Sequence, residues 1–188
     1  GFIPGGLAHT NVLASIIFAG MSGAAVADAG GLGLIEIQAM REDGYDDDFS
    51  AAITGASSTI GPIIPPSIPM VVYCVLTGTS VAAMFAAGVF PGLLMGFAMM
   101  VIAYVIALKR GYPRHPISGP KELLLATVDA LPTLATPAII LWGVLGGICT
   151  PTEAGAVATF YSLILGLFVY RTLKWSDIKK ALVDTAIS

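Results

Sequence analysis

Apolar residues form long runs along this chain, and short polar turns separate them. The runs over residues 81–108, 131–148 and 154–170 approach or exceed the roughly 20 residues that an α-helix needs to cross the hydrocarbon core of a membrane. The pattern predicts an all-α integral membrane protein with several transmembrane helices.

Two shorter apolar segments precede these runs. Residues 10–19 would form only about 15 Å of helix at roughly 1.5 Å per residue, which is too short to cross a core of about 30 Å. The turn-prone residues Gly20-Met21-Ser22-Gly23 follow, and then a second apolar segment, residues 24–40. We expect residues 1–43 to form a re-entrant helical hairpin with its tip near residues 20–24. The alternative is a single kinked spanning helix with small residues on its packing face.

Residues 44–80 contain the strongest interruption. Four prolines and a glycine lie within residues 57–69, and proline both lacks an N–H and clashes with the preceding helical turn. Inside a membrane, irregular backbone persists only where it is buried in protein or lines a wet cavity. Transporters use the free backbone groups of such broken helices to hold ions and substrates. We therefore expect a discontinuous transmembrane helix, broken at residues 57–69, that forms a transport site.

The rest of the chain is expected to supply spanning helices and one loop. Residues 81–108 are predicted to form a long helix with a kink at Pro91-Gly92. Residues 109–130 are predicted to form a basic cytoplasmic loop and an amphipathic helix over residues 122–130. Residues 131–188 are predicted to form scaffold transmembrane helices, of which the last is truncated.

Three polar features are expected to have local structural roles. Thr150, Pro151 and Glu153 match the N-cap, N1 and N3 positions of a capping box. The carboxylates of residues 46–48 are expected to cap the following helix rather than to hold a metal ion. Asn11 is expected to bond to a neighbouring helix.

Composition and charge narrow the class of protein. Of the 188 residues, 56% are hydrophobic and 11% are charged, whereas soluble domains average about 25% charged residues. The net charge of −3 is too small to imply a partner, and no basic patch suited to nucleic acid is present. If the hairpin enters and leaves on one side, all nine Lys and Arg residues fall on that side. The positive-inside rule then places the basic loops in the cytoplasm.

Six short strings, spread over nearly the whole chain, match the pattern of one transporter family. They are Pro4-Gly5-Gly6-Leu7-Ala8-His9, Phe18-Ala19-Gly20-Met21-Ser22-Gly23, Ala25-Val26-Ala27-Asp28, Gly44-Tyr45, Ala56-Ser57-Ser58-Thr59-Ile60-Gly61-Pro62-Ile63-Ile64-Pro65-Pro66-Ser67-Ile68-Pro69-Met70 and Thr150-Pro151-Thr152-Glu153-Ala154. With them the sequence resembles a fragment of the large membrane (DctM-type) subunit of TRAP transporters, the tripartite ATP-independent periplasmic transporters. One departure is Ala24, where the family often has a second serine, so that a backbone oxygen would have to replace a hydroxyl ligand.

The resemblance implies a sodium-coupled secondary transporter of bacterial inner membranes, built from inverted repeats and working by an elevator motion. A soluble periplasmic binding protein would deliver an organic acid, commonly a dicarboxylate or a sialic acid. A small membrane subunit would brace the large one in the lipid bilayer. Sodium ions would be the coupling ions, and no other cofactor and no catalytic residue is expected. The second hairpin and second broken helix of the family would lie beyond Ser188.

The expected binding site lies where the hairpin tip faces the break. Sodium needs several oxygen ligands at once, and the predicted ligands are carbonyls or hydroxyls of Ser22, Gly23, Ser57, Ser58, Thr59 and Gly61. The residues expected to shape the substrate side, where the N-terminus of the next half-helix attracts a carboxylate, are Pro65, Pro66 and Ser67. Asp28 is expected to support the site, either by its charge or by hydrogen bonds that orient the tip. Alternatively, the hydroxyls bond back to helix carbonyls and only repair the break.

Two other functions compete with the transporter hypothesis. The string Gly20-Met21-Ser22-Gly23 also fits the G-x-S-G pattern of intramembrane serine proteases, whose serine needs a base within hydrogen-bond reach. His9 precedes Ser22 by thirteen positions, which is about 20 Å along a helix, and His115 falls in the predicted cytoplasmic loop. An ion channel is the third possibility, but a hairpin that faces a broken helix suits alternating access better.

Overall fold

The computed structural model describes residues 3–114 and 119–187, and throughout these residues the regular structure is helical. The elements are α1 (Gly6–Ser22), α2 (Ala25–Ala27), the π-helix η1 (Asp28–Leu32), α3 (Gly33–Glu42), α4 (Asp47–Ser58), α5 (Ile68–Thr77), α6 (Val81–Arg110), α7 (Pro120–Leu145), α8 (Pro151–Ile164), the π-helix η2 (Leu165–Val169) and α9 (Trp175–Ile187). Three helical stretches are long and apolar enough to cross a membrane, namely Val81–Arg110, Leu124–Leu145 and Pro151–Val169. The all-α membrane architecture predicted from the sequence is confirmed.

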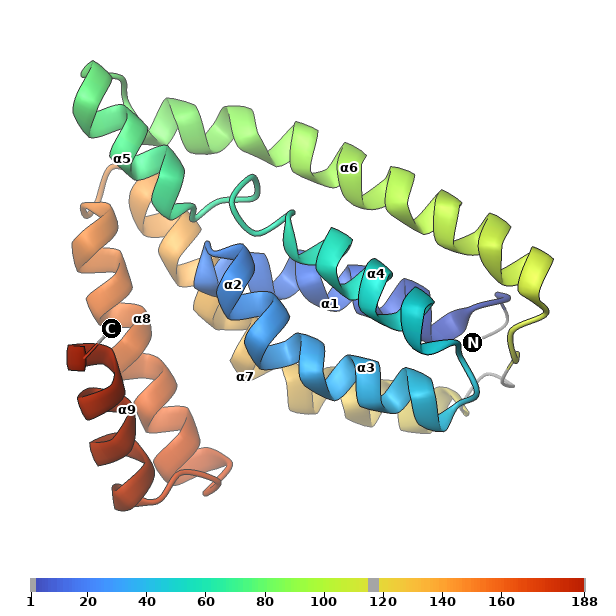
Figure 1. Cartoon of the computed structure of the whole chain (residues 1–188). Helices are drawn as coiled ribbons and strands as arrows, with labels where there is room; N and C mark the ends of the chain where they lie inside the picture. Colours follow the sequence, from blue (N-terminus) through green and yellow to red (C-terminus); the bar gives the residue numbers. More distant parts are fainter. Residues whose placement is uncertain (1–2, 115–118, 188) are drawn as a thin grey trace.

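Residues 6–42 form a helical hairpin (Figure 1). Helix α1 runs from the N-terminal end of the bundle to Ser22, and α2, η1 and α3 return beside it, with contacts from α1 to both η1 and α3. Gly23 ends α1 with a left-handed φ of 60°, and its N–H donates to the Ala19 carbonyl at 3.1 Å. We call residues 22–24 the tip. The return arm differs from the single helix expected over residues 24–40, because a π-helical turn begins at Asp28.

The broken helix consists of α4 and α5, joined by residues 59–67, which we call the break. Helix α4 ends in tightened turns, in which the N–H of Ile60 donates to the Ser57 carbonyl at 3.0 Å and the N–H of Gly61 to the Ser58 carbonyl at 3.1 Å. The prolines that follow have no N–H with which to continue the helix. Ser67 then starts α5 as its N-cap, and its hydroxyl oxygen accepts from the Met70 N–H at 3.3 Å.

Helix α6 is continuous from Val81 to Arg110, and Pro91 lies inside it. Three glycines on one face let the break and α1 approach its backbone. A Cβ atom would come within 2.6 Å of the Ile63 carbonyl oxygen at Gly88, 2.3 Å of Ile64 at Gly92 and 2.5 Å of Ile16 at Gly96. The hairpin, α4, the break and α6 therefore share one apolar core, which includes Val12, Ile53, Ile60 and Ala103.

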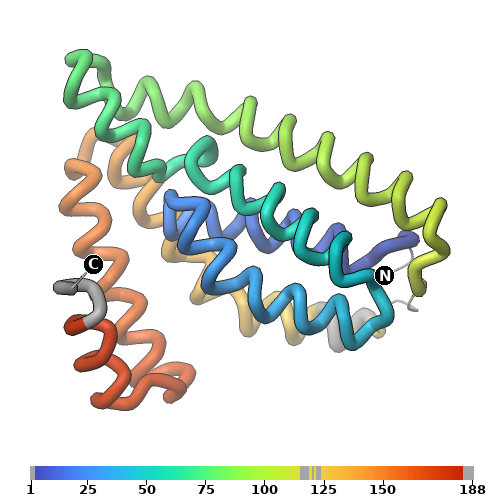
Figure 2. Tube along the Cα trace, viewed as in Figure 1, coloured from blue at the N-terminus to red at the C-terminus, as the bar shows by residue number. Residues whose placement is uncertain are grey.

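Helices α7 and α8 form a second packed unit, whose core includes Ile140, Val144 and Ala158 together with Phe85 of α6. The structure has one helix, Pro120–Leu145, where the sequence predicts an amphipathic helix and a separate span. Two tyrosines bond to the backbone of α7 near Pro132: the Tyr161 hydroxyl donates to the Pro132 carbonyl at 2.9 Å, and the Tyr170 hydroxyl donates to the Asp129 carbonyl at 2.5 Å. Beyond η2 the chain reverses its direction and continues into α9 (Figure 2).

The capping box predicted at the start of α8 is confirmed. The Thr150 hydroxyl oxygen accepts from the Glu153 N–H at 3.3 Å, and the Glu153 carboxylate accepts from the Thr150 N–H at 2.8 Å. The acidic residues 46–48 lie at the start of α4 as expected, with Asp46 at the N-cap and Asp47 and Asp48 in the first turn, but the Asp46 side chain makes no capping bond.

Candidate functional site

The hairpin tip lies directly against the break (Figure 1). A Cβ atom at Gly23 would come within 2.5 Å of the Pro66 carbonyl oxygen and 3.2 Å of the Ser67 Cα. A Cβ atom at Gly61 would come within 3.3 Å of the Ala24 carbonyl carbon. The tip therefore touches both ends of the break, and only glycine permits the approach at Gly23, where the backbone is also left-handed. The predicted partners are adjacent in space although about forty residues separate them in sequence.

The tip contributes one uncommitted hydroxyl. The Ser22 Oγ atom is buried and has no hydrogen-bond partner among the described residues. Gly23 itself is buried, and its N–H is used to close α1. A buried polar atom without a partner is unfavourable, so Ser22 is the predicted ligand with the clearest free oxygen.

The serine and threonine hydroxyls at the end of α4 are engaged with carbonyls of their own helix. Ser58 Oγ donates to the Gly55 carbonyl at 2.9 Å, and Thr59 Oγ1 donates to the Ala56 carbonyl at 2.6 Å. These are the back-bonds that the alternative hypothesis describes. They do not exclude ion binding, because a hydroxyl that donates its proton still has oxygen lone pairs to offer a cation.

Ser57 is placed differently from its neighbours. It is fully buried, and its hydroxyl donates to the Asn11 Oδ1 atom at 2.8 Å and accepts from the Ser15 hydroxyl at 3.0 Å. The Asn11 amide nitrogen in turn donates to the Thr54 hydroxyl at 2.7 Å. The expected bond from Asn11 to a neighbouring helix is thus confirmed, and that helix is α4. Ser15 was missed, although its spacing of four residues from Asn11 in an apolar segment was a usable signal.

The three residues predicted to lie on the substrate side, Pro65, Pro66 and Ser67, form the C-terminal end of the break. Pro65 is buried, Pro66 is partly buried and Ser67 is 1% exposed. The Ser67 hydroxyl donates to the Pro62 carbonyl at 2.6 Å and caps α5. In the first turn of α5, Pro69 has no N–H, and the Met70 N–H donates to the Ser67 hydroxyl. Among the hydrogen bonds of the described residues, this leaves the Ile68 N–H as the free donor of this turn for an anion.

A cavity of about 290 Å³ opens where the tip, the break and α8 meet. Its lining includes the hydroxyl-bearing residues Ser22, Ser67 and Thr152, and apolar residues such as Phe85 and Ile140 make up most of the rest. No Lys or Arg lines it among the described residues. The cavity is next to Pro66 and Ser67, the predicted substrate side, but it supplies no positive charge of its own.

Asp28 lies one turn beyond the tip, at the start of the π-helix η1, and is 1% exposed. Neither of its carboxylate oxygens has a hydrogen-bond partner of ordinary geometry among the described residues. Ser15 approaches it, but the hydroxyl of Ser15 donates to Ser57. The structure therefore does not show the hydrogen bonds by which Asp28 was expected to orient the tip, which leaves its charge as the open possibility.

The protease arrangement is absent from the described residues. Neither Ser22 Oγ nor His9 Nε2 has a hydrogen-bond partner there, so the two do not form a dyad. His115 lies outside the described residues. No group of three or more His, Cys, Asp or Glu side chains suited to a metal ion occurs in residues 3–114 and 119–187.

Comparison with known proteins places the chain in a transporter family. The model of the tripartite ATP-independent periplasmic transporter DctM component matches residues 1–188. The chain is 48% identical over 185 residues to the sialic acid TRAP transporter large permease protein SiaM of Vibrio cholerae, covering 98% of the chain and 43% of that protein. It is 44% identical over 185 residues to the C4-dicarboxylate TRAP transporter large permease protein DctM of Pseudomonas aeruginosa, again covering 98% of the chain and 43% of that protein.

The sialic acid TRAP transporter permease protein SiaT of Haemophilus influenzae is 48% identical over 173 residues, which is 92% of the chain and 28% of that protein. The chain thus spans less than half the length of each of these relatives. Proteins of this family are transporter permeases rather than enzymes. The match over all 188 residues shows that this multi-pass membrane chain belongs to the DctM family of TRAP transporter large permease proteins.

Proposed function

We propose that the chain is part of the large subunit of a sodium-coupled importer of organic acids. The observation that carries the proposal is the contact of the hairpin tip with both ends of the break, through Gly23 and Gly61. Broken backbone inside a membrane protein is where transporters bind ions and substrates. Here the two interrupted elements meet each other rather than lipid.

The proposed sodium ligands are the oxygens of Ser22, Gly23, Ser58, Thr59 and Gly61, with Ser57 next to them. Hard cations prefer carbonyl and hydroxyl oxygens, and both kinds are concentrated at this contact. The unpartnered Ser22 hydroxyl supports the assignment. The carboxylate of Asp28, one turn away, would attract the cation without touching it.

The proposed substrates are carboxylates, held next to Pro65, Pro66 and Ser67. The relatives named for sialic acid and for C4-dicarboxylates support this class, and the Ile68 N–H at the start of α5 is a suitable donor for one carboxylate oxygen. Because no Lys or Arg of the described residues lines the adjacent cavity, the cationic contact with the substrate would come from another part of the transporter.

The proposed assembly has two further components and one orientation. A periplasmic binding protein would deliver the acid, and a small membrane subunit would brace the large one, as the tripartite family description implies. The basic residues at the end of α6 and beyond η2 would face the cytoplasm in the inner membrane. Elevator-type movement of the hairpin and broken helix against α7 and α8 would have to break the packing of Met70 and Val71 of α5, and of Phe85 of α6, on the core of α7 and α8.

Uptake by the complete transporter in proteoliposomes tests the proposal. The vesicles would contain the large subunit that carries this chain and the small subunit, and radiolabelled sialic acid or succinate would be added with the periplasmic binding protein. We expect uptake with an inward sodium gradient and little uptake when choline replaces sodium or the binding protein is omitted. Uptake that ignores sodium would contradict the coupling, and flux of sodium without an acid would indicate a channel.

A further inference from the structure

A small polar network crosses the apolar core between the hairpin and the broken helix. Asn11 and Ser15 lie on α1, Thr54 and Ser57 lie on α4, and all four are at most 3% exposed. Their neighbours in this core are apolar residues such as Val12 and Ile53. Polar side chains at such positions are retained only where they bond to one another.

Asn11 uses both ends of its amide in this network. Its Nδ2 atom donates to Thr54 Oγ1 at 2.7 Å, and its Oδ1 atom accepts from Ser57 Oγ at 2.8 Å. Thr54 and Ser57 are three residues apart and share one face of α4. One side chain of the hairpin therefore bonds to two successive turns of α4. The two bonds together fix the rotation of α4 about its axis and its position along α1.

The network lies next to the contact between tip and break. Ser57 is the next-to-last residue of α4, and the break begins two residues later. On the hairpin side, Ser15 precedes the tip residue Ser22 by seven positions, which is about 10 Å of helix. The two elements that carry the proposed ion ligands are thus joined about two turns before the tip on the hairpin side, and directly before the break on the α4 side.

The hydroxyl of Ser57 is fully used in this joint. It donates to Asn11 and also lies 3.0 Å from the Thr54 carbonyl, and it accepts from Ser15. Ser58 and Thr59 bond only within their own helix, so they do not fix α4 against α1. This difference in bonding indicates that Ser57 holds α4 in place against α1, while the hydroxyls of Ser58 and Thr59 remain available to an ion.

We propose that Asn11 is a positioning residue for sodium binding. It holds Ser57 and the end of α4 in register with the hairpin. The inference rests on the proposed function, since it concerns the same ion site. Without the amide, α1 and α4 are expected to lose their fixed register, so that the tip and break oxygens meet less often in the arrangement that binds the ion. The loss should appear in the sodium concentration for half-maximal uptake rather than in the amount of folded protein.

The test compares Asn11→Leu, which keeps a similar volume and removes both hydrogen-bonding ends, with Ser50→Ala as a matched control. Ser50 lies on the same helix α4 and is also fully buried, but its hydroxyl only donates to the Asp46 carbonyl of its own chain segment at 2.9 Å. Sodium-driven uptake in proteoliposomes would be measured at saturating organic acid. We expect Asn11→Leu to raise the half-maximal sodium concentration about fivefold or more, with maximal uptake largely kept, and Ser50→Ala to change it less than about twofold.

A double variant separates positioning from general packing. If Asn11 acts through Ser57, then Asn11→Leu should add little to the effect of Ser57→Ala, since both remove the same joint. Fully additive effects, or an unchanged sodium dependence in Asn11→Leu, would overturn the inference. If Asn11→Leu fails to assemble, Thr54→Val carries the same test, because it removes the acceptor of the Asn11 amide nitrogen and keeps a similar volume. Sodium-independent uptake by the unaltered transporter would contradict the proposed function itself, and so the two failures are distinguishable.

Discussion

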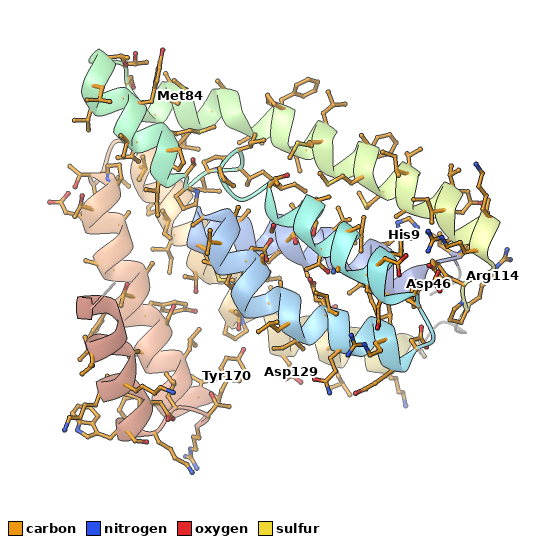
Figure 3. The ribbon with its side chains drawn as sticks, in the orientation of Figure 1. His9, Asp46, Met84, Arg114, Asp129 and Tyr170 are labelled. Atoms are coloured by element: carbon orange, nitrogen blue, oxygen red, sulfur yellow. The ribbon has the colours of Figure 1, made fainter. Side chains whose placement is uncertain are left out.

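The hairpin, α4 and α6 form one unit, and different kinds of contact hold its two ends together (Figure 3). At the end that carries Asp46 and Arg114, side chains hold the elements together. Arg110 donates to the Asp46 carboxylate at 2.6 Å, and the Tyr112 hydroxyl donates to the same oxygen at 2.7 Å. Aromatic rings pack beneath, with the Tyr45 and Tyr112 centroids 4.4 Å apart. At the tip and the break, the contacts are made by glycine and backbone atoms instead.

The difference separates a fastened end from a working end. Charged and aromatic side chains join the turn before α4 to the end of α6, so the hairpin, α4 and α6 are held as one unit there. At the tip, which carries the proposed ion ligands, the backbones approach closely and few side-chain bonds join the two elements. Changes at the tip should therefore alter transport, and changes at the other end should alter stability.

Adding one methyl group at the tip should have the largest effect on transport. In Gly23→Ala the new Cβ atom would meet the Pro66 carbonyl oxygen at 2.5 Å, and the residue would also keep a left-handed φ of 60°. We expect uptake to fall by at least about 100-fold, because displaced tip oxygens cannot complete the ion site. The fall in uptake would be measured from initial rates of sodium-driven uptake in proteoliposomes.

Gly55→Ala is the matched control for this variant. Gly55 lies in α4, and a Cβ atom there would meet no atom within 4 Å beyond its chain neighbours and the backbone of its own helix. Alanine also favours helix over glycine, so this variant should insert and transport like the unaltered protein. Normal uptake by Gly23→Ala would show that the close contact of tip and break is not needed for transport.

Removing single hydroxyls at the working end should have a smaller and more specific effect. Ser22→Ala deletes the buried hydroxyl that has no partner among the described residues, so it should raise the half-maximal sodium concentration several-fold and leave thermal stability unchanged. Thr77→Val is a suitable control, because its hydroxyl also lies in an apolar helix but bonds to the Tyr73 carbonyl, away from the tip. An unchanged sodium dependence in Ser22→Ala would remove Ser22 from the ligand set.

The sequence predicts the working end better than the fastened end. Glycines and prolines break helices through local backbone chemistry, so Gly23 and the prolines of the break could be found from the residues alone. Asp46 was expected to cap α4, yet it pairs with Arg110, which lies 64 positions away. Such a pairing depends on how α6 packs against α4. It has no local signature.

The continuity of α7 and the partners of Asn11 also depend on how distant helices pack. The helix α7 continues through Pro132, and tyrosines of α8 and beyond bond to carbonyls near that proline, contacts that only the assembled fold provides. Asn11 was expected to bond across to another helix because it is a lone amide in an apolar segment. Its partners Thr54 and Ser57 follow from the packing of α1 on α4, which the hydrophobic pattern does not specify.

Asp28 lies in the return arm of the hairpin, one turn beyond the tip. Its carboxylate is buried without a hydrogen-bond partner among the described residues, and an unpaired charge in such a place is destabilising. Asp28→Asn keeps the shape and removes the charge. We expect an unchanged or slightly higher unfolding temperature in detergent, together with weaker activation of uptake by sodium. A clear loss of stability would show that the carboxylate has a structural partner, and unchanged activation would remove its supporting role.

The smallest effect is expected from Asp46→Asn at the fastened end. The hydrogen bonds from Tyr112 and then Arg110 lower the pKa of Asp46 below its usual value of 3.8. A lowered pKa in the folded state means that the ionised group stabilises the fold above pH 3.8, and that this contribution is lost as the pH falls below that value. Because the Asp46 and Arg110 side chains are about half exposed, water and salt screen the pair.

We therefore expect Asp46→Asn to lower the unfolding temperature at pH 7 by no more than a few degrees, with the difference shrinking at acidic pH and at high salt. Thermal unfolding of the purified protein between pH 3 and pH 7 would measure it, and sodium activation of uptake should stay unchanged. If Asp46→Asn instead altered sodium activation without altering stability, the division between a fastened end and a working end would be wrong, because the charged cluster would then be coupled to the ion site through α4.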